Sequence, residues 1–272
     1  MTDKNQPFYL PPGQVIPKEI TEELKTINDT YSKSKDFPKY LQDIRKFFNL
    51  NQTIHSTDSR LFFAGFLEGE GSLNVSAKKL ETAKFGLIVD PEFNLTQHIN
   101  GVNHLYSALA IFQTGRIRYK SGSNATLVFT IDNRIALEEK VIPFYEKYVA
   151  PYAAPIKYKR VQTFKQILLL FKQDAHKDLD QFTNKLLPLW DSLRMQKGQS
   201  NESFSGLLEA QDFARNRTSF ISSFPLSSPF PLREEKRERK RGTDERGSMQ
   251  QLLTLWCSMF NLTHSNPSRT WT

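Results

Sequence analysis

The chain has 272 residues, a formal net charge of +8 and 38% hydrophobic residues, 21 of them Phe. This suits one domain with appendages or two small domains around a real core, and the basic excess points to a polyanionic partner. The single cysteine, Cys257, excludes an intramolecular disulfide, and the five scattered histidines lack zinc-ligand spacing. No apolar run reaches the roughly 20 residues of a membrane span. The N-terminus carries no secretion or import signal.

The first 60 residues predict an extension to the main domain. Residues 1–17 are polar and Pro-rich, which indicates an irregular arm. Apolar side chains at helical spacing then predict helices over Lys18–Tyr31 and Phe37–Phe48. A polar linker, Asn51–Ser59, follows. The helices could dock on the core or on the polyanionic partner.

Two carboxylates stand at the end of the next predicted helix, Leu61–Gly69. Glycine ends helices, so Glu70 should lie at or just past the C-terminus. The helix dipole is negative there and disfavours acids by up to about 1 kcal/mol each. A bound cation is the simplest compensation for Glu68 and Glu70.

One face of this helix is almost bare, because Gly65 and Gly69 are four residues apart and Ala64 is adjacent. A bare face lets two backbones approach closely, and a second copy of the same helix is the natural neighbour. The pattern predicts a dimer interface at Ala64, Gly65 and Gly69. Spacing alone also fits incidental glycines beside solvated loop acids.

Four segments alternate polar and apolar residues, which predicts half-buried strands. They are Ser72–Leu80, Phe85–His98, Gly115–Lys120 and Thr126–Ile131. Pro91 in the second strand predicts an edge position or a bulge.

Helices should separate and follow these two hairpins. They are predicted at Val102–Phe112, at Ala136–Val149 with a kink at Pro143, at Lys159–Lys172 and at Asp178–Gln196, after a loop at Pro151–Pro155. The order predicts an α+β fold with helices on one face of an antiparallel sheet and the other face free.

The C-terminal part changes in composition. Residues 215–272 contain a stretch rich in Ser, Pro and Phe and a dense charged run, Arg233–Arg246, which together predict a disordered basic tail. Leu252–Phe260 could form a short helix. The predicted domains are therefore an extension over 1–60, a core over 61–214 and a tail over 215–272.

The segment Phe63–Gly71 resembles the LAGLIDADG signature, with Glu in place of both aspartates. The resemblance continues through Lys84–His98 and Thr114–Asp132 to about Ala214. The chain is most similar to the single-motif, homodimeric LAGLIDADG homing endonucleases encoded in chloroplast large-subunit ribosomal RNA introns. That resemblance implies an αββαββα fold, a β-sheet saddle, a homodimer and a chloroplast location without an import signal.

The family uses the polar face of the sheet to contact double-stranded DNA, over a long, roughly palindromic target. An outward polar face suits the major groove, where each base pair has its own donor and acceptor pattern. The positions that inherit this role are Asn74, Ser76, Lys78, Asp90, Glu92, Asn94, Arg116, Arg118, Lys120, Asn124 and Thr126.

The resemblance also implies the chemistry. Glu70, one from each subunit, matches the metal-binding acid and implies Mg²⁺ or another divalent ion, while Glu68 supports the helix end. Gln97 matches the residue that positions water. Lys157 falls where a basic residue lies near the cleaved phosphate, although Lys159 and Arg160 are close and Lys157 could be a solvated surface lysine.

The expected function is a site-specific DNA endonuclease that makes a double-strand break in an intronless large-subunit rRNA gene and so promotes intron homing. Two alternatives share the fold. One is an RNA-binding intron maturase, which often carries two motif copies, whereas one is found here. The other is a catalytically silent DNA-binding protein, which would tolerate loss of the acid that this chain retains at Glu70.

Overall fold

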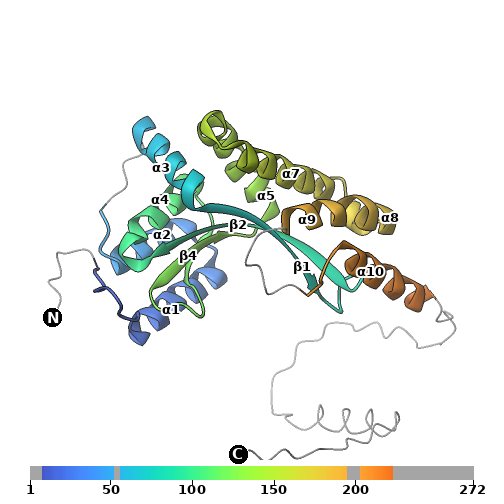
Figure 1. Cartoon of the computed structure of the whole chain (residues 1–272). Helices are drawn as coiled ribbons and strands as arrows, with labels where there is room; N and C mark the ends of the chain where they lie inside the picture. The colour runs from blue at the N-terminus through green and yellow to red at the C-terminus, as the bar shows by residue number, and fades with distance from the viewer. Residues whose placement is uncertain (1–7, 52–55, 195–202, 223–272) are drawn as a thin grey trace, which may run out of the picture. The chain divides into compact units, whose positions relative to one another are not determined.

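The computed structural model describes residues 8–51, 56–194 and 203–222 (Figure 1). The elements in chain order are α1 (Lys18–Ser34), α2 (Phe37–Phe47), α3 (Thr57–Glu70), β1 (Gly71–Lys79), β2 (Leu87–His98), η1 (Ile99–Gly101), α4 (Val102–Phe112), β3 (Arg116–Tyr119), β4 (Thr126–Ile131), α5 (Arg134–Ala136), η2 (Leu137–Val141), α6 (Ile142–Phe144), η3 (Tyr145–Val149), η4 (Ala150–Tyr152), α7 (Pro155–Lys172), η5 (Ala175–Lys177), α8 (Leu179–Gln181), η6 (Phe182–Leu186), α9 (Leu187–Arg194) and α10 (Leu207–Ser222).

The strands form one antiparallel sheet in the order β1-β2-β4-β3. Every second side chain along each strand is buried, as the alternation in the sequence predicts. With α3 before the first hairpin, α4 between the two and helical turns after the second, the predicted α+β, αββαββα architecture is confirmed.

Phe side chains join the helices to the apolar face of the sheet. The ring centroid of Phe112, on α4, lies 5.7 Å from that of Phe93 on β2 and 5.9 Å from that of Phe63 on α3. Phe144 lies 5.4 Å from Phe112 and completes the cluster. Burying each of these side chains stabilises the fold by about 1.5–3 kcal/mol.

Pro91 lies within β2 without a bulge. The register with β1 is continuous from Gly71↔Leu95 to Lys79↔Leu87, whereas β4 pairs with β2 only from Phe93 onward. Pro91 therefore stands where β2 has a partner on one side only, which is the edge-like position that a residue without an N–H tolerates.

Helical turns over 134–149 are continuous but irregular around Pro143. The π-helical turns η2 and η3 flank the short α6 that contains this proline. Such turns are a usual response to an interrupted hydrogen-bond ladder. The next helix, α7, begins at Pro155, four residues before its predicted start, because proline fits the first helical turn.

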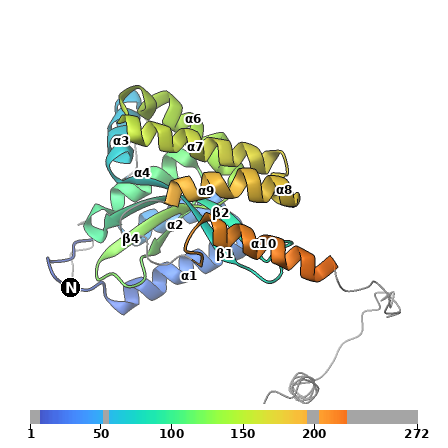
Figure 2. The same ribbon diagram turned by 45° about the vertical axis from the view of Figure 1, so that its right-hand side comes forward.

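The N-terminal extension docks on the sheet. α1 packs against α2 and along β3, and α2 also contacts α4. Figures 1 and 2 show α7 and α9 on one side of the strands and α1 on the other. The polar face is therefore flanked by α1 at its β3 edge. The prediction that this whole face is free is wrong at that edge.

α10 was not predicted, and it corrects the expected start of the tail. It runs to Ser222, inside the region predicted to be disordered from residue 215. Ala210 and Ala214 are four apart and fully buried, and Phe213 lies near the β1–β2 hairpin, 3.0 Å from the position a Cβ on Gly86 would take. The rest of the predicted tail, including Leu252–Phe260, lies outside the described residues.

Among the described helices, none has the length and apolar character needed to cross a bilayer.

Gly115 and Gly122 provide a matched pair for testing the entry to β3. Both have positive φ, +89° and +77°, but a Cβ on Gly115 would lie 2.6 Å from the Phe129 ring, whereas one on Gly122 meets nothing within 4 Å. We expect Gly122→Ala to lower the free energy of unfolding by about 1 kcal/mol through backbone strain. Gly115→Ala should cost about 2 kcal/mol more through overlap. Urea unfolding measures both, and equal losses would contradict the close packing.

Candidate active site and nucleic-acid interface

The junction of α3 and β1 places Glu70. The Gly71 N–H donates to the Leu67 carbonyl and closes the helix, so Glu70 is its last residue. A Cβ on Gly71 would lie 2.5 Å from the Leu67 carbonyl oxygen, so only glycine allows this immediate passage from helix to strand. Glu70 is exposed, and no hydrogen bond to its carboxylate occurs within the described residues.

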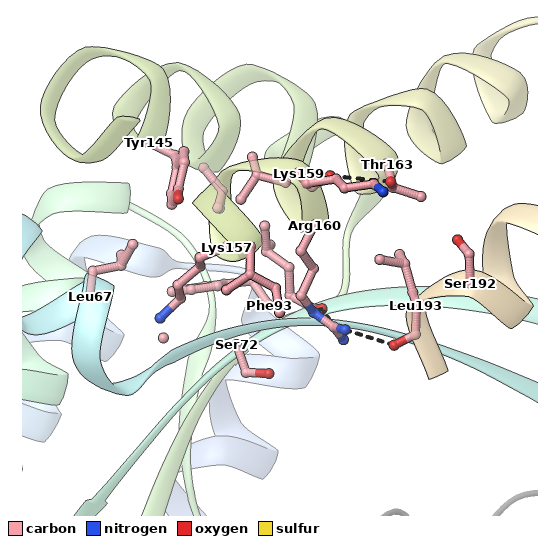
Figure 3. A pocket seen from close by; sticks show the side chains of 15 residues that line it. Leu67, Ser72, Phe93, Tyr145, Lys157, Lys159, Arg160, Thr163, Ser192 and Leu193 are labelled. Carbon is pink, nitrogen blue, oxygen red and sulfur yellow. Dashed lines mark hydrogen bonds between the residues drawn. The ribbon is translucent and has the colours of Figure 1, made fainter. Parts of the chain in front are cut away.

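The end of α3 is latched to the start of α7. The Lys157 ammonium donates to the Glu68 carbonyl, and the Ala154 N–H donates to Glu68 Oε1 at 3.1 Å. Figure 3 shows Lys157 extending from α7 toward the end of α3. A cation at a helix C-terminus is favourable, so part of the compensation that the acid-rich helix end requires comes from the chain itself.

Burial and charge oppose each other at Lys157. Burial lowers the pKa of Lys157, while the nearby carboxylates of Glu68 and Glu70 act to raise it. Burial and the Glu68 carboxylate raise the pKa of Tyr145 to about 12, so this hydroxyl stays protonated at neutral pH. Within the described residues, Glu68 Oε2 and the Tyr145 hydroxyl are buried without a hydrogen-bond partner.

Of the three basic residues considered from the sequence, Lys157 is the one at the end of α3. Arg160 donates to the Leu73 carbonyl through Nε and Nη2, at 3.2 and 3.0 Å, and to the Leu193 carbonyl through Nη1 at 2.7 Å. It therefore ties α7 to β1 and α9. Lys159 is exposed and lines, with Lys157 and Arg160, a cavity of about 540 Å³ beside the α3–β1 junction.

Gln97 lies at the same end of the sheet. Gly71 pairs with Leu95, and β2 continues two residues further to Gln97. A Cβ on Gly101 would lie 2.7 Å from Gln97 Cγ, so the turn after β2 is closely packed on this side chain. Gln97 Oε1 accepts from the His98 N–H at 2.8 Å, which fixes the amide orientation.

Most of the predicted DNA-contacting residues share the polar face. Those within strands alternate with buried residues and are half-buried or exposed: Asn74, Ser76, Lys78, Asp90, Glu92, Asn94, Arg116, Arg118 and Thr126. Lys120 and Asn124 lie just beyond the strands, in the β3–β4 connection, and are exposed.

The polar face carries its own hydrogen bonds. Asn94 Nδ2 donates to Glu92 Oε1 and Asn94 Oδ1 accepts from the Thr130 hydroxyl, both at 2.8 Å. Lys78 pairs with Asp90 at 3.1 Å, so both acids on this face are engaged. Thr130 also belongs to this face, as the alternation of β4 predicts. Ser72, which donates to Asn74 at 2.8 Å, belongs to it as well but was left out of the predicted set, although the alternation of β1 could have included it.

The bare face of α3 is open in the single chain. A Cβ on Gly65 or Gly69 would meet nothing within 4 Å. Leu61 and Phe62, on the preceding turn, are 46% and 66% exposed. Ala64, predicted at the same interface, is instead buried in the core of its own protomer at 4% exposure, because it lies about 100° around the α3 axis from Gly65.

The donors present fit a hard cation shared between protomers. The described residues contain no group of three or more His, Cys, Asp or Glu side chains that could hold a metal. One chain therefore offers Glu70 and little else at this point. Mg²⁺ binds through one or two carboxylates and retains waters and phosphate oxygens, so a pair of Glu70 side chains on DNA would suffice.

Comparisons with known proteins place this geometry in a family. Residues 63–168 match the model of the LAGLIDADG endonuclease family. The DNA endonuclease I-CeuI of Chlamydomonas moewusii is 62% identical over 209 residues, which cover 77% of this chain and 96% of that protein. The chain belongs to the LAGLIDADG endonuclease family. Enzymes of this family depend on divalent metal ions.

Solved LAGLIDADG structures agree. The group I intron-encoded homing endonuclease I-CeuI complexed with DNA matches with a TM-score of 0.74 and 61% identity, over 76% of this chain and 100% of that one. The archaeal intron-encoded homing endonuclease I-Vdi141I complexed with DNA matches with a TM-score of 0.52 and 26% identity, over 59% of this chain and 96% of that one.

The charges at the site predict that the pKa of Lys157 depends on Glu70. Because Glu70 acts to raise the pKa of Lys157, we expect Glu70→Gln to lower that pKa further below the usual lysine value. NMR titration of lysine Nζ signals measures this. Lys172, whose pKa is raised by Glu138, provides the internal reference and should not change. An unchanged Lys157 would mean that the two groups do not interact.

Proposed function

We propose that this protein is a homing endonuclease that cuts both strands of an intronless large-subunit rRNA gene at one site. The observation that carries the proposal is the exposed Glu70 carboxylate at the end of α3, held beside Lys157 and next to a sheet face lined with polar groups. The identity with I-CeuI supports the same conclusion for most of the chain.

Each residue at the junction has a role that follows from its place. Glu70 would hold a divalent ion, proposed to be Mg²⁺, together with the Glu70 of a second copy. When bound, that ion would lower the pKa of a water molecule in contact with it and would stabilise negative charge on the phosphate oxygens. Lys157 lies at the helix end and can stabilise negative charge on the cleaved phosphate. Gln97, at the same end of the sheet, orients water through its amide.

The polar face is proposed to read DNA. Arg118 and Lys120 are exposed and suit the O6 and N7 acceptors of guanine, and Asn74 and Asn94 suit adenine. The Lys78 ammonium offsets the charge of Asp90 near phosphate, and Asn94 donates a hydrogen bond to Glu92. Many such contacts spread over four strands would give a long site with partial tolerance at individual base pairs.

A symmetric dimer follows from the open face of α3. Gly65 and Gly69 leave room for a second α3, and the exposed Leu61 and Phe62 offer apolar area beside them. Such an arrangement brings two Glu70 side chains together and doubles the sheet face across a two-fold axis. The target is then roughly palindromic. The resemblance to enzymes from chloroplast rRNA introns supports the proposed gene target and a chloroplast location.

Glu70→Gln tests the chemistry. With purified protein, Mg²⁺ and an intronless large-subunit rRNA gene, we expect one double-strand break from the wild type and none from the variant. Binding should stay equal or become tighter, since removing a carboxylate removes repulsion from phosphate. Glu146→Gln, on an exposed ion pair with Lys165, is the control and should cut normally. Undiminished cutting by Glu70→Gln would overturn the mechanism, and wild-type binding without cutting would indicate a silent DNA-binding protein.

Gly65→Arg tests the dimer. A side chain here meets open space within the protomer, and replacing a helical glycine favours the helix by up to about 1 kcal/mol, so the protomer should remain folded. We expect analytical ultracentrifugation to show a monomer that no longer cuts DNA. Thr26→Arg, on the exposed side of α1, should remain dimeric and active. A dimeric and active Gly65→Arg variant would place the interface elsewhere.

A further inference from the structure

The edge strand β3 carries Arg116 and Arg118, the two arginines of the proposed DNA-contacting set. Within the sheet this strand is held on one side only. β3 has four residues, Arg116–Tyr119, and pairs with β4 alone. A strand with one partner is free to shift along its open edge. A bidentate contact from an arginine to guanine tolerates little displacement, so the support of this strand bears directly on base recognition.

Side chains of the N-terminal extension take the place of a second neighbouring strand beside β3. The Ile117 N–H donates to the Tyr40 hydroxyl at 2.9 Å, and Asn28 Nδ2 donates to the Ile117 carbonyl at 2.9 Å. The backbone of β3 is therefore bonded on its outer side as a neighbouring strand would bond it.

This support is a closed network. The Tyr40 hydroxyl donates to Asn28 Oδ1 at 3.1 Å, and Asn28 Nδ2 also donates to the Leu24 carbonyl at 2.8 Å. Asn28 and Tyr40 are 7% and 2% exposed, and Ile117 is fully buried. A buried and fully satisfied polar network rigidifies the segment it joins.

The same extension contacts an arginine directly. Tyr31 stacks on Tyr40 with ring centroids 4.5 Å apart, and the Arg116 guanidinium carbon lies 5.5 Å from the Tyr31 centroid. An aromatic face under a guanidinium restrains it and attracts its charge. Arg118, next on this face, lines a groove together with α1 residues that include Asn28.

The extension also holds the connection after β3. The Ile16 N–H donates to the Asn124 carbonyl at 2.8 Å. Asn124 is itself one of the proposed DNA-contacting residues. Within the described residues, the arm and both helices thus hydrogen-bond to β3 and to the connection that follows it.

We propose that Asn28, Tyr31 and Tyr40 are positioning residues for base specificity, which act by holding Arg116 and Arg118 in register with the DNA. The inference rests on the proposed function of the sheet face. It differs from a purely structural role, in which the extension only covers a strand edge and its loss weakens binding to every sequence alike.

The test is a cleavage profile over a set of target DNAs that carry every single base-pair substitution. Arg118→Ala first identifies the base pairs that β3 reads, where discrimination should fall by about 5- to 150-fold. Tyr40→Phe keeps the ring and loses both hydroxyl bonds. It should lower discrimination by about 3- to 10-fold at those base pairs and their neighbours only, because the arginines remain but are less well placed. Tyr31→Leu should do the same around the contact of Arg116, with the buried network intact.

Ile167→Val, a buried change in α7, is the control for lost stability and should leave the profile unchanged. All variants are assayed well below their melting temperatures. Profiles of Tyr40→Phe and Tyr31→Leu that match wild type, or change uniformly, would overturn the positioning role while leaving the proposed function in place. If Arg118→Ala itself changes no base-pair preference, the reading role of β3 is wrong, and the inference fails with it.

Discussion

The contact of the Lys157 ammonium with the last-turn carbonyl of α3 joins the parts on which the site depends. Helix α3 ends in two acids, which its own dipole disfavours, and the Lys157 ammonium donates to the half-buried Glu68 carbonyl there. The same contact, with the Ala154–Glu68 hydrogen bond, sets the start of α7 against the end of α3. Glu70 and Lys157 are thereby presented together, and neither needs a flexible loop to reach the other.

α3 serves three surfaces at once. Phe63 and Leu67 pack into the core, Gly65 and Gly69 leave an open face where the second copy is proposed to pack, and Glu70 ends the helix. Each surface occupies a different side or end of one helix. A substitution that displaces α3 would therefore move all three surfaces together. β1 begins at Gly71, directly after α3, without a loop. The position of the Glu70 carboxylate is therefore tied to that of the polar face of the sheet.

Local pattern predicted the parts of the fold that local chemistry determines. The alternation along β1 to β4 separates core from polar residues correctly, and the glycines after α3 end it where expected. Long-range contacts left no such trace. The bonds from Asn28 and Tyr40 to Ile117 join residues 89 and 77 positions apart, and nothing periodic marks them. α10 was not predicted because its burial depends on contacts with α9 and the β1–β2 hairpin. The start of α7 was predicted four residues too late because Pro155 was assigned to a loop.

For the proposed site, the sequence predicted residue types but not their contacts. Glu70, Gln97 and Lys157 followed from family resemblance, and the structure brings all three to the same end of the sheet. Which of three nearby basic residues would face α3 depended on Arg160 being taken by two carbonyls, a fact available only from the fold. Composition could not separate Ala64 from Gly65, although Ala64 is buried in the core and Gly65 faces open space.

The row of hydrogen bonds from Glu92 through Asn94 to Thr130 has a consequence for retargeting this enzyme. Exchanging Asn94 alone would release both of its neighbours. On the proposed reading role of this face, base preference would then change at several base pairs rather than one. The effects of substitutions at Glu92, Asn94 and Thr130 therefore depend on one another, and these three side chains have to be varied together. Within the described residues no hydrogen bond joins the Arg118 side chain to another residue of this face, so its proposed base contact could be changed by a single substitution.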